Sequence, residues 1–250
     1  MATTTEMRYA AGVGIVLGAA SCSASAFAYR PFDSTDADVV KPGELEFEIG
    51  PVGYLRETDD RFLVVPALIA NAGIFERWEL VLEGRHRIRT EPVPGEARDE
   101  LADTALSIKG LLREGSMQNG SGLSVATEVG ALLPTTEPET GVGASATLIL
   151  SERDDFGAAH LNGALFLSRT HRPGALAGLI LEGPIAWPVR PVIEGLFQRE
   201  SDVGAVATGL IGFIWRARDN LSFDGAIRGG RAFDMALVEV RAGLTWAFEL

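Results

Sequence analysis

The chain has 250 residues, of which 22 are basic and 34 acidic, so its formal net charge is -12. This acidic balance argues against nucleic acid as a partner. A hydrophobic content of 46% with 22% charged residues excludes a disordered chain.

The first 28 residues have the pattern of a cleaved secretory signal peptide. Arg8 precedes an apolar run over 9–20, and Ala-Phe-Ala at 26–28 fits a small-x-small cleavage site. Cleavage there removes the only cysteine, Cys22, and with it any possible disulfide. Lipoprotein processing at Cys22 is the alternative.

Beyond residue 28 the dominant pattern is a strict alternation of apolar and polar side chains, which is typical of β-strands. No apolar run of about 18 residues follows, which excludes a helical membrane protein. About twelve strands are expected, near 44–49, 62–72, 78–87, 103–113, 123–133, 142–151, 160–168, 175–185, 191–200, 204–215, 221–228 and 238–249.

Charged side chains in mid-strand distinguish a membrane barrel from a soluble sandwich. An arginine or lysine that faces lipid at the midplane costs about 2–4 kcal/mol, so the charged parity is expected to face a wet lumen. The lumen-facing candidates are Glu44, Glu46, Glu48, Glu79, Glu83, Arg85, Lys109, Glu128, His160, Glu194, Glu239 and Arg241. The acidic row at 44, 46 and 48 is interpreted as part of a solvated, arginine-paired wall, with cation selectivity as the alternative.

The sequence therefore predicts an all-β fold, a transmembrane antiparallel up-and-down barrel of about 12 strands of the outer-membrane type. The barrel is expected over 44–250, after a short periplasmic segment at 29–43. Short and long connections alternate along the chain, as they do between periplasmic turns and external loops.

Aromatic residues near strand ends are candidates for interfacial girdles in outer-membrane lipid. They are Tyr54, Trp78, Trp187, Trp215, Trp246 and Phe248. The last strand places Trp246, Phe248 and Leu250 on one face, which resembles the C-terminal signal read by the outer-membrane assembly machinery.

Short motifs recur in order along the mature chain. They are RPFDSTDA at 30–37, KPGELEFE at 41–48, FERWEL at 75–80, ADT at 102–104 with Lys109, and LPT at 133–135 followed by Gly141 and Gly143. Together they resemble the family named for the MetA pathway of phenol degradation. The resemblance implies an outer-membrane barrel that carries small compounds, often apolar or aromatic, and it implies no binding residues.

No catalytic, cofactor-binding or metal-binding motif stands out. His160 and Asn162 share the lumen parity, but no G-x-S-x-G motif accompanies them, and the other histidines have no ligand-spaced partners.

The function expected is passive or facilitated uptake of small-molecule solutes through a channel in the bacterial outer membrane, with no cofactor and no enzymatic activity. Three alternatives remain open: a lipid-active barrel enzyme using His160, a secreted β-sandwich binding protein, and a plugged barrel that only anchors or adheres.

Overall fold

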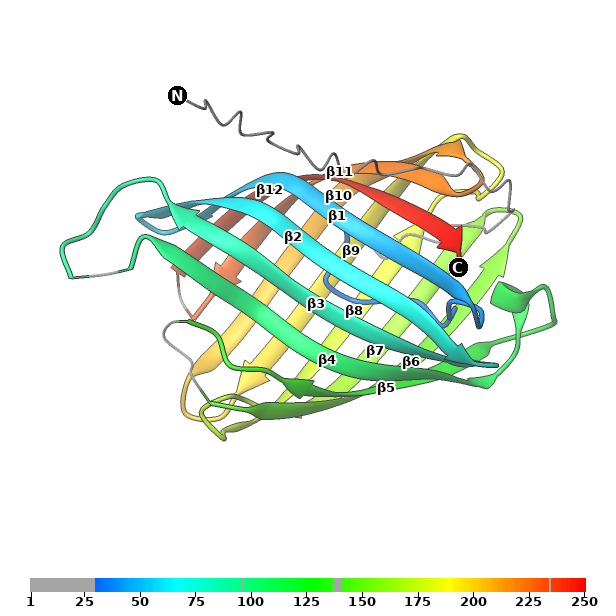
Figure 1. Cartoon of the computed structure of the whole chain (residues 1–250), viewed down its shortest axis with the longest axis horizontal. Coiled ribbons are helices and arrows are strands. Elements are labelled where there is room, and N and C mark those ends of the chain that lie inside the picture. The colour runs from blue at the N-terminus through cyan, green and yellow to red at the C-terminus, as the bar shows by residue number, and fades with distance from the viewer. Residues whose placement is uncertain (1–29, 96, 137–140, 234) are drawn as a thin grey trace, which may run out of the picture.

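The computed structural model describes residues 30–95, 97–136, 141–233 and 235–250. Twelve antiparallel strands form one closed barrel, in which each strand pairs with its neighbours in sequence and β1 pairs with β12 (Figure 1). The elements are β1 (Glu44–Glu57), β2 (Asp60–Phe75), β3 (Trp78–Arg89), β4 (Asp99–Arg113), the short 3-10 helix η1 (Ser116–Gln118), β5 (Ser124–Leu132), β6 (Gly143–Asp154), β7 (Gly157–Leu167), β8 (Pro173–Glu182), β9 (Val189–Glu200), β10 (Gly204–Arg218), β11 (Leu221–Ala232) and β12 (Met235–Glu249).

The expected twelve-stranded barrel is confirmed, and its closure excludes the β-sandwich alternative. The expected leader over 1–28, with Cys22, lies outside the described residues. Within the described part of the chain, no helix is long and apolar enough to cross a membrane.

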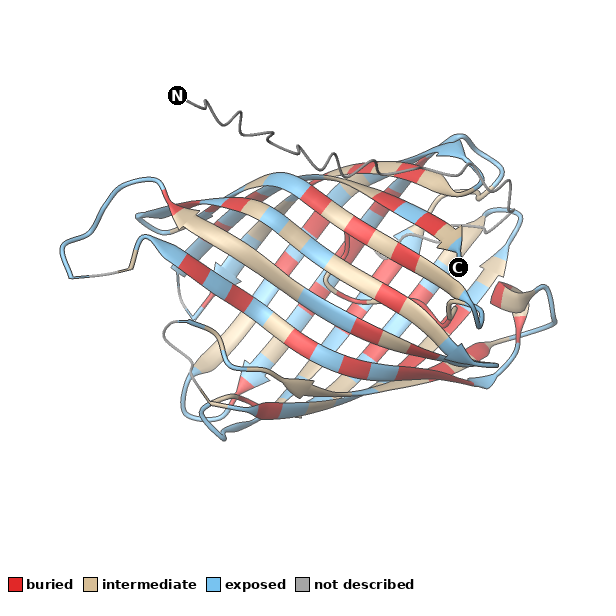
Figure 2. Ribbon diagram, in the orientation of Figure 1, coloured by how far each residue is buried: buried red, intermediate tan, exposed pale blue. Residues whose placement is uncertain are grey.

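The alternation of side chains produces two chemically different faces of the wall. On β7, Leu161 and Leu165 are 51% and 71% exposed, whereas His160 and Asn162 between and beside them are buried. Figure 2 shows the same alternation along neighbouring strands. Because the barrel is closed, the exposed apolar parity is the outer face and the buried polar parity faces the lumen.

The two ends of the barrel differ in their connections. The N-terminus of β1, the C-terminus of β12, and η1 lie at one end, which we call the termini end (Figure 1). The opposite end, the loop end, carries the long β3–β4 and β5–β6 loops.

The identity of the lipid face can be tested by placing one charge on each side of β7. We expect Leu161→Arg to lower the free energy of unfolding by about 2–4 kcal/mol, because the guanidinium would face hydrocarbon. Ala164→Arg is the control, since Ala164 lines a cavity inside the barrel. Chemical denaturation in lipid vesicles measures both, and equal losses would contradict the assignment of the two faces.

Candidate channel lumen and the segment inside it

The segment before β1 lies inside the barrel. We call residues 30–41 the lumen insert. Its side chains and backbone contact inward-facing residues of strands from β1 to β12, far from it in sequence. The sequence predicted a short periplasmic segment at 29–43, whereas these contacts place the insert within the lumen, where Figure 1 shows it behind β2 and β3.

Backbone amides of the insert donate to carboxylates of the wall. Arg30 N donates to Glu48 Oε2 at 2.7 Å, and Val40 N donates to Glu79 Oε2 at 2.6 Å. The two oxygens of Glu194 accept from the consecutive amides of Asp33 and Ser34, at 2.9 and 2.8 Å.

These bonds provide acceptors for backbone amides of a segment that has no strand partner along most of its length. A buried N–H without an acceptor costs free energy, so wall carboxylates do here what a neighbouring strand does in a sheet. The row at 44, 46 and 48 is therefore not simply a solvated wall paired with arginines, because Glu48 is fully buried and holds the backbone of Arg30.

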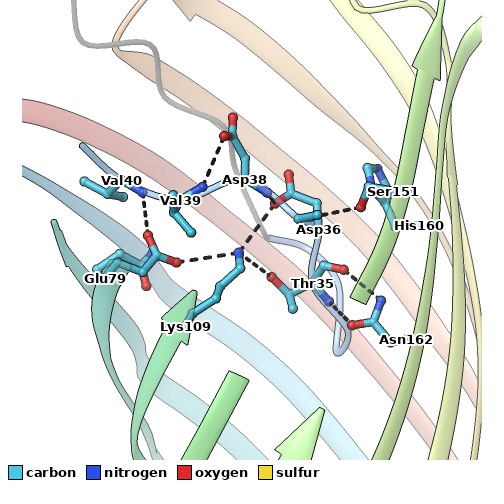
Figure 3. A network of polar contacts seen from close by, with 12 residues as sticks. Thr35, Asp36, Asp38, Val39, Val40, Glu79, Lys109, Ser151, His160 and Asn162 are labelled. Atoms are coloured by element: carbon cyan, nitrogen blue, oxygen red, sulfur yellow. Dashed lines mark hydrogen bonds and ion pairs between the residues drawn. The ribbon is translucent and has the colours of Figure 1, made fainter. Parts of the chain in front are cut away.

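A second set of contacts surrounds Lys109 of β4 (Figure 3). Its Nζ lies 3.5 Å from Glu79 Oε1, 3.6 Å from Asp36 Oδ1 and 3.4 Å from Thr35 Oγ1. Asn162 of β7 donates to the carbonyl of Thr35 at 2.7 Å and accepts from its amide at 3.3 Å. The insert is thus bonded to opposite sides of the barrel.

Asp33 is the centre of a charged network. Its carboxylate lies between Arg228 and Arg241, with Arg241 Nη2 at 2.6 Å. Both arginines also bind Glu239, at 2.6 and 2.8 Å. Burial alone would raise the pKa of Asp33, but Arg241 and Arg228 outweigh it and hold that pKa well below its usual range. Asp33 is therefore ionised at neutral pH.

The apolar side chain of the insert, Phe32, packs against one side of the wall. Its buried neighbours come from β8–β11 and include Ile180, Val192 and Ile214. This apolar inner surface differs from the sequence-based expectation, in which the lumen parity is charged.

Glycines in the wall make room for the insert. A Cβ on Gly178 would lie 2.1 Å from Ser34 Oγ, and a Cβ on Gly243 would lie 2.3 Å from Arg30 Nε. Both distances are shorter than any normal contact, so glycine at these positions permits the close approach.

His160 lies in a buried polar cluster. Its Nδ1 is 2.9 Å from Ser151 Oγ, and its Nε2 is 3.2 Å from Glu182 Oε1. The other carboxylate oxygen of Glu182 accepts a hydrogen bond from Arg190 Nε. Ser151 Oγ also accepts the amide of Ala37 at 2.9 Å. The histidine is 1% exposed and turned to the lumen, so the geometry supports a role in holding the insert rather than contact with lipid.

A cavity of about 600 Å³ lies between the insert and the loop end. One side is charged and is formed by β3, β4, β11 and β12, with Arg85, Arg228, Arg241, Asp103 and Glu239. The other side comes from β7–β10 and is mixed, with the apolar Phe166, Leu176, Leu196 and Val206 beside the polar Asn162, Gln198 and Glu200. The insert forms the boundary of the cavity through residues 30 and 32–35.

All twelve sequence candidates lie on the inner face. Seven line the cavity, namely Glu79, Glu83, Arg85, Lys109, Glu128, Glu239 and Arg241. Glu46, Glu48, His160 and Glu194 are buried, and Glu44 shares their parity at the termini end. The residues that sequence reasoning missed are those of the insert, above all Asp33 and Asp36. Among the residues that the structure describes, no group of three His, Cys, Asp or Glu is arranged to hold a metal ion.

Comparisons with known proteins support the fold. No protein-family model matches the sequence, and no curated protein is similar enough to count as a match. An outer-membrane channel from Pseudomonas putida F1 is similar in structure, with a TM-score of 0.62 at 10% identity over 87% of this chain and 100% of the channel. The KdgM porin in complex with disordered oligogalacturonate has a TM-score of 0.59 at 9% identity over 82% of this chain and 99% of the porin.

At such low identity the likeness shows the fold alone, which is that of outer-membrane channels. The expected barrel fold of the outer-membrane type is confirmed, while membership of the MetA-pathway family stays a prediction. Both solved structures are channels rather than enzymes.

Removing the carboxylate of Asp33 should loosen the insert. Asp33→Ala leaves Arg228 and Arg241 without one anionic partner, and breaking a buried pair in this way costs about 3–5 kcal/mol. We expect a higher single-channel conductance in planar bilayers. Asp202→Ala, in the exposed β9–β10 turn, is the control. Unchanged conductance in both variants would show that Asp33 does not hold the insert.

A steric change should act in the same direction without altering charge. Gly178→Val would place its side chain where Ser34 lies, so we expect it to displace the insert and raise the conductance. Gly163→Val is the control, because Gly163 shares the outer face of the neighbouring β7 with Leu161 and a Cβ there meets nothing within 4 Å. Equal conductance in the two variants would contradict close packing of the insert at Gly178.

Proposed function

We propose that this protein is a channel of the bacterial outer membrane for small solutes that combine an apolar or aromatic part with a polar group. The observation that carries the proposal is the cavity of about 600 Å³, which has a cluster of charged residues on one side and apolar side chains beside a few polar ones on the other. Its size lies within the range of about 300–1,000 Å³ that is usual for small-molecule sites.

The two-sided lining suits such a solute physically. An aromatic ring gains free energy from burial against side chains such as Phe166 and Leu196. A carboxylate or hydroxyl group would lie opposite, near Arg85, which is paired with Glu239, and near Arg241, which is paired with Asp33 and Glu239. The resemblance of the sequence to the MetA-pathway family supports the same class of solute.

Passage of a solute through the barrel requires the insert to move. It occupies the lumen on the termini side of the cavity and is bonded to several strands. A solute that reaches the cavity from the loop end therefore needs the insert to shift before it leaves. The same observation favours the second candidate, a plugged barrel that only anchors or adheres, in which the insert never moves.

Solute flux into vesicles that contain the reconstituted protein distinguishes the channel from the anchoring barrel. We expect the parent protein to admit an aromatic carboxylate faster than a neutral sugar of similar mass or an oligogalacturonate. Leu196→Asp removes an apolar contact worth about 1.5 kcal/mol, so it should lower the aromatic flux about tenfold and leave sugar flux unchanged. Ser145→Asp adds the same charge elsewhere on the cavity wall and is the control.

Two outcomes would contradict the proposal. Equal effects of Leu196→Asp and Ser145→Asp would remove the role of the apolar side. Absence of both conductance and flux, in the parent and in Asp33→Ala, would favour the anchoring barrel.

A further inference from the structure

The outer face of the barrel differs between its two ends. All 4 tryptophans, Trp78, Trp187, Trp215 and Trp246, are at the termini end and are between 39% and 53% exposed. At the loop end, four strands instead carry an exposed arginine on the outer face. One of them, Arg61 of β2, is paired with Glu91. The other three are Arg56 of β1, Arg199 of β9 and Arg231 of β11, which we call the arginine belt.

Their outward direction follows from strand parity. Arg56 is exposed between buried Leu55 and half-buried Glu57, Arg199 precedes buried Glu200, and Arg231 precedes buried Ala232. The outer-face residues that lead to each arginine are uncharged. On β9 they are Val189, Pro191, Ile193, Gly195 and Phe197, and on β11 they are Leu221, Phe223, Gly225, Ile227 and Gly229.

The belt lies one membrane thickness from the tryptophans. In the register of the sheet Trp246 pairs with Phe47, and Arg56 is nine residues further along β1. Trp215 pairs with Val189, ten residues before Arg199, and Trp246 pairs with Leu221, ten residues before Arg231. At about 3.3 Å per residue and a tilt of about 40°, these spans are about 23–25 Å, the height of the apolar band of such barrels.

Small side chains flank two arginines of the belt. Arg199 pairs across the sheet with Ala175 and Ala205, and Arg231 pairs with Ala207 and Ala236. Arg56 pairs across the sheet with Val238 and Arg61, and its Nε donates to the carbonyl of Thr58 at 2.9 Å. In the sequence an aspartate follows each arginine of the belt three residues later, namely Asp59, Asp202 and Asp234.

We propose that the arginine belt binds the phosphate groups of lipopolysaccharide in the outer leaflet. With short turns and both termini on the periplasmic side, the loop end faces the cell exterior, where the leaflet carries phosphorylated glycolipid. Guanidinium groups bind phosphate through paired hydrogen bonds, and tryptophan suits the zwitterionic interface at the other end. The belt is independent of solute passage.

The test is lipid binding to the purified full-length protein in detergent, measured by native mass spectrometry. The probes are diphosphorylated lipid A, lipid A with its phosphates removed, and phosphatidylethanolamine. We expect the parent to prefer diphosphorylated lipid A. The triple variant Arg56→Gln, Arg199→Gln, Arg231→Gln should bind it about 100-fold more weakly, at about a factor of five for each cation near an anionic surface.

The matched control removes three exposed arginines from the termini end, with Arg113→Gln, Arg216→Gln and Arg218→Gln. It should retain the affinity of the parent. Equal affinity of the parent for lipid A with and without phosphates, equal losses in both triple variants, or no loss in the belt variant would overturn the proposal. Heat-modifiable gel mobility verifies folding. If the triple variant misfolds, Arg199→Gln alone tests the proposal, with an expected fivefold loss of affinity for diphosphorylated lipid A.

Discussion

The structure depends on one constraint: an extended segment enclosed by a barrel must find hydrogen-bond acceptors for its backbone amides. The insert meets this constraint with side chains of the wall, because Glu48, Glu79 and Glu194 accept the amides of Arg30, Val40, Asp33 and Ser34. These carboxylates come from three different strands. Their positions thus follow from the path of the insert, which precedes all three strands in the sequence. The glycines at 178 and 243 follow from the same path, since any side chain there would occupy its space.

Charge neutralisation inside the barrel is shared between the insert and the wall. Asp33 and Asp36 bring anions to Arg228, Arg241 and Lys109, while wall residues such as Glu239 complete the pairs. Loss of the insert would therefore leave inward cations with fewer partners and buried carboxylates with fewer donors. This reciprocal dependence explains how a lumen of twelve strands can be filled by a segment with no secondary structure of its own.

Much of the wall could be predicted from the sequence, and the insert could not. Alternation along β7 and β9 fixes the face of His160 and Glu194 because side-chain direction has a period of two residues. The bond between Arg241 and Asp33 joins residues 208 apart, and no local pattern predicts it. The apolar patch of Ile180, Val192 and Ile214 was missed because membrane barrels were expected to have polar interiors. The sequence carries one signal of the insert. An inward row of carboxylates without neighbouring cations needs hydrogen-bond donors from another part of the chain.

The covalent link between the insert and β1 has a further consequence for any ligand of the cavity. A tethered occupant faces its site at an effective concentration in the millimolar range, however dilute the protein is. The insert therefore returns to its place after every displacement, because it never leaves its own chain. On the proposed route, which needs the insert to shift, this fast return would keep each interval of passage short.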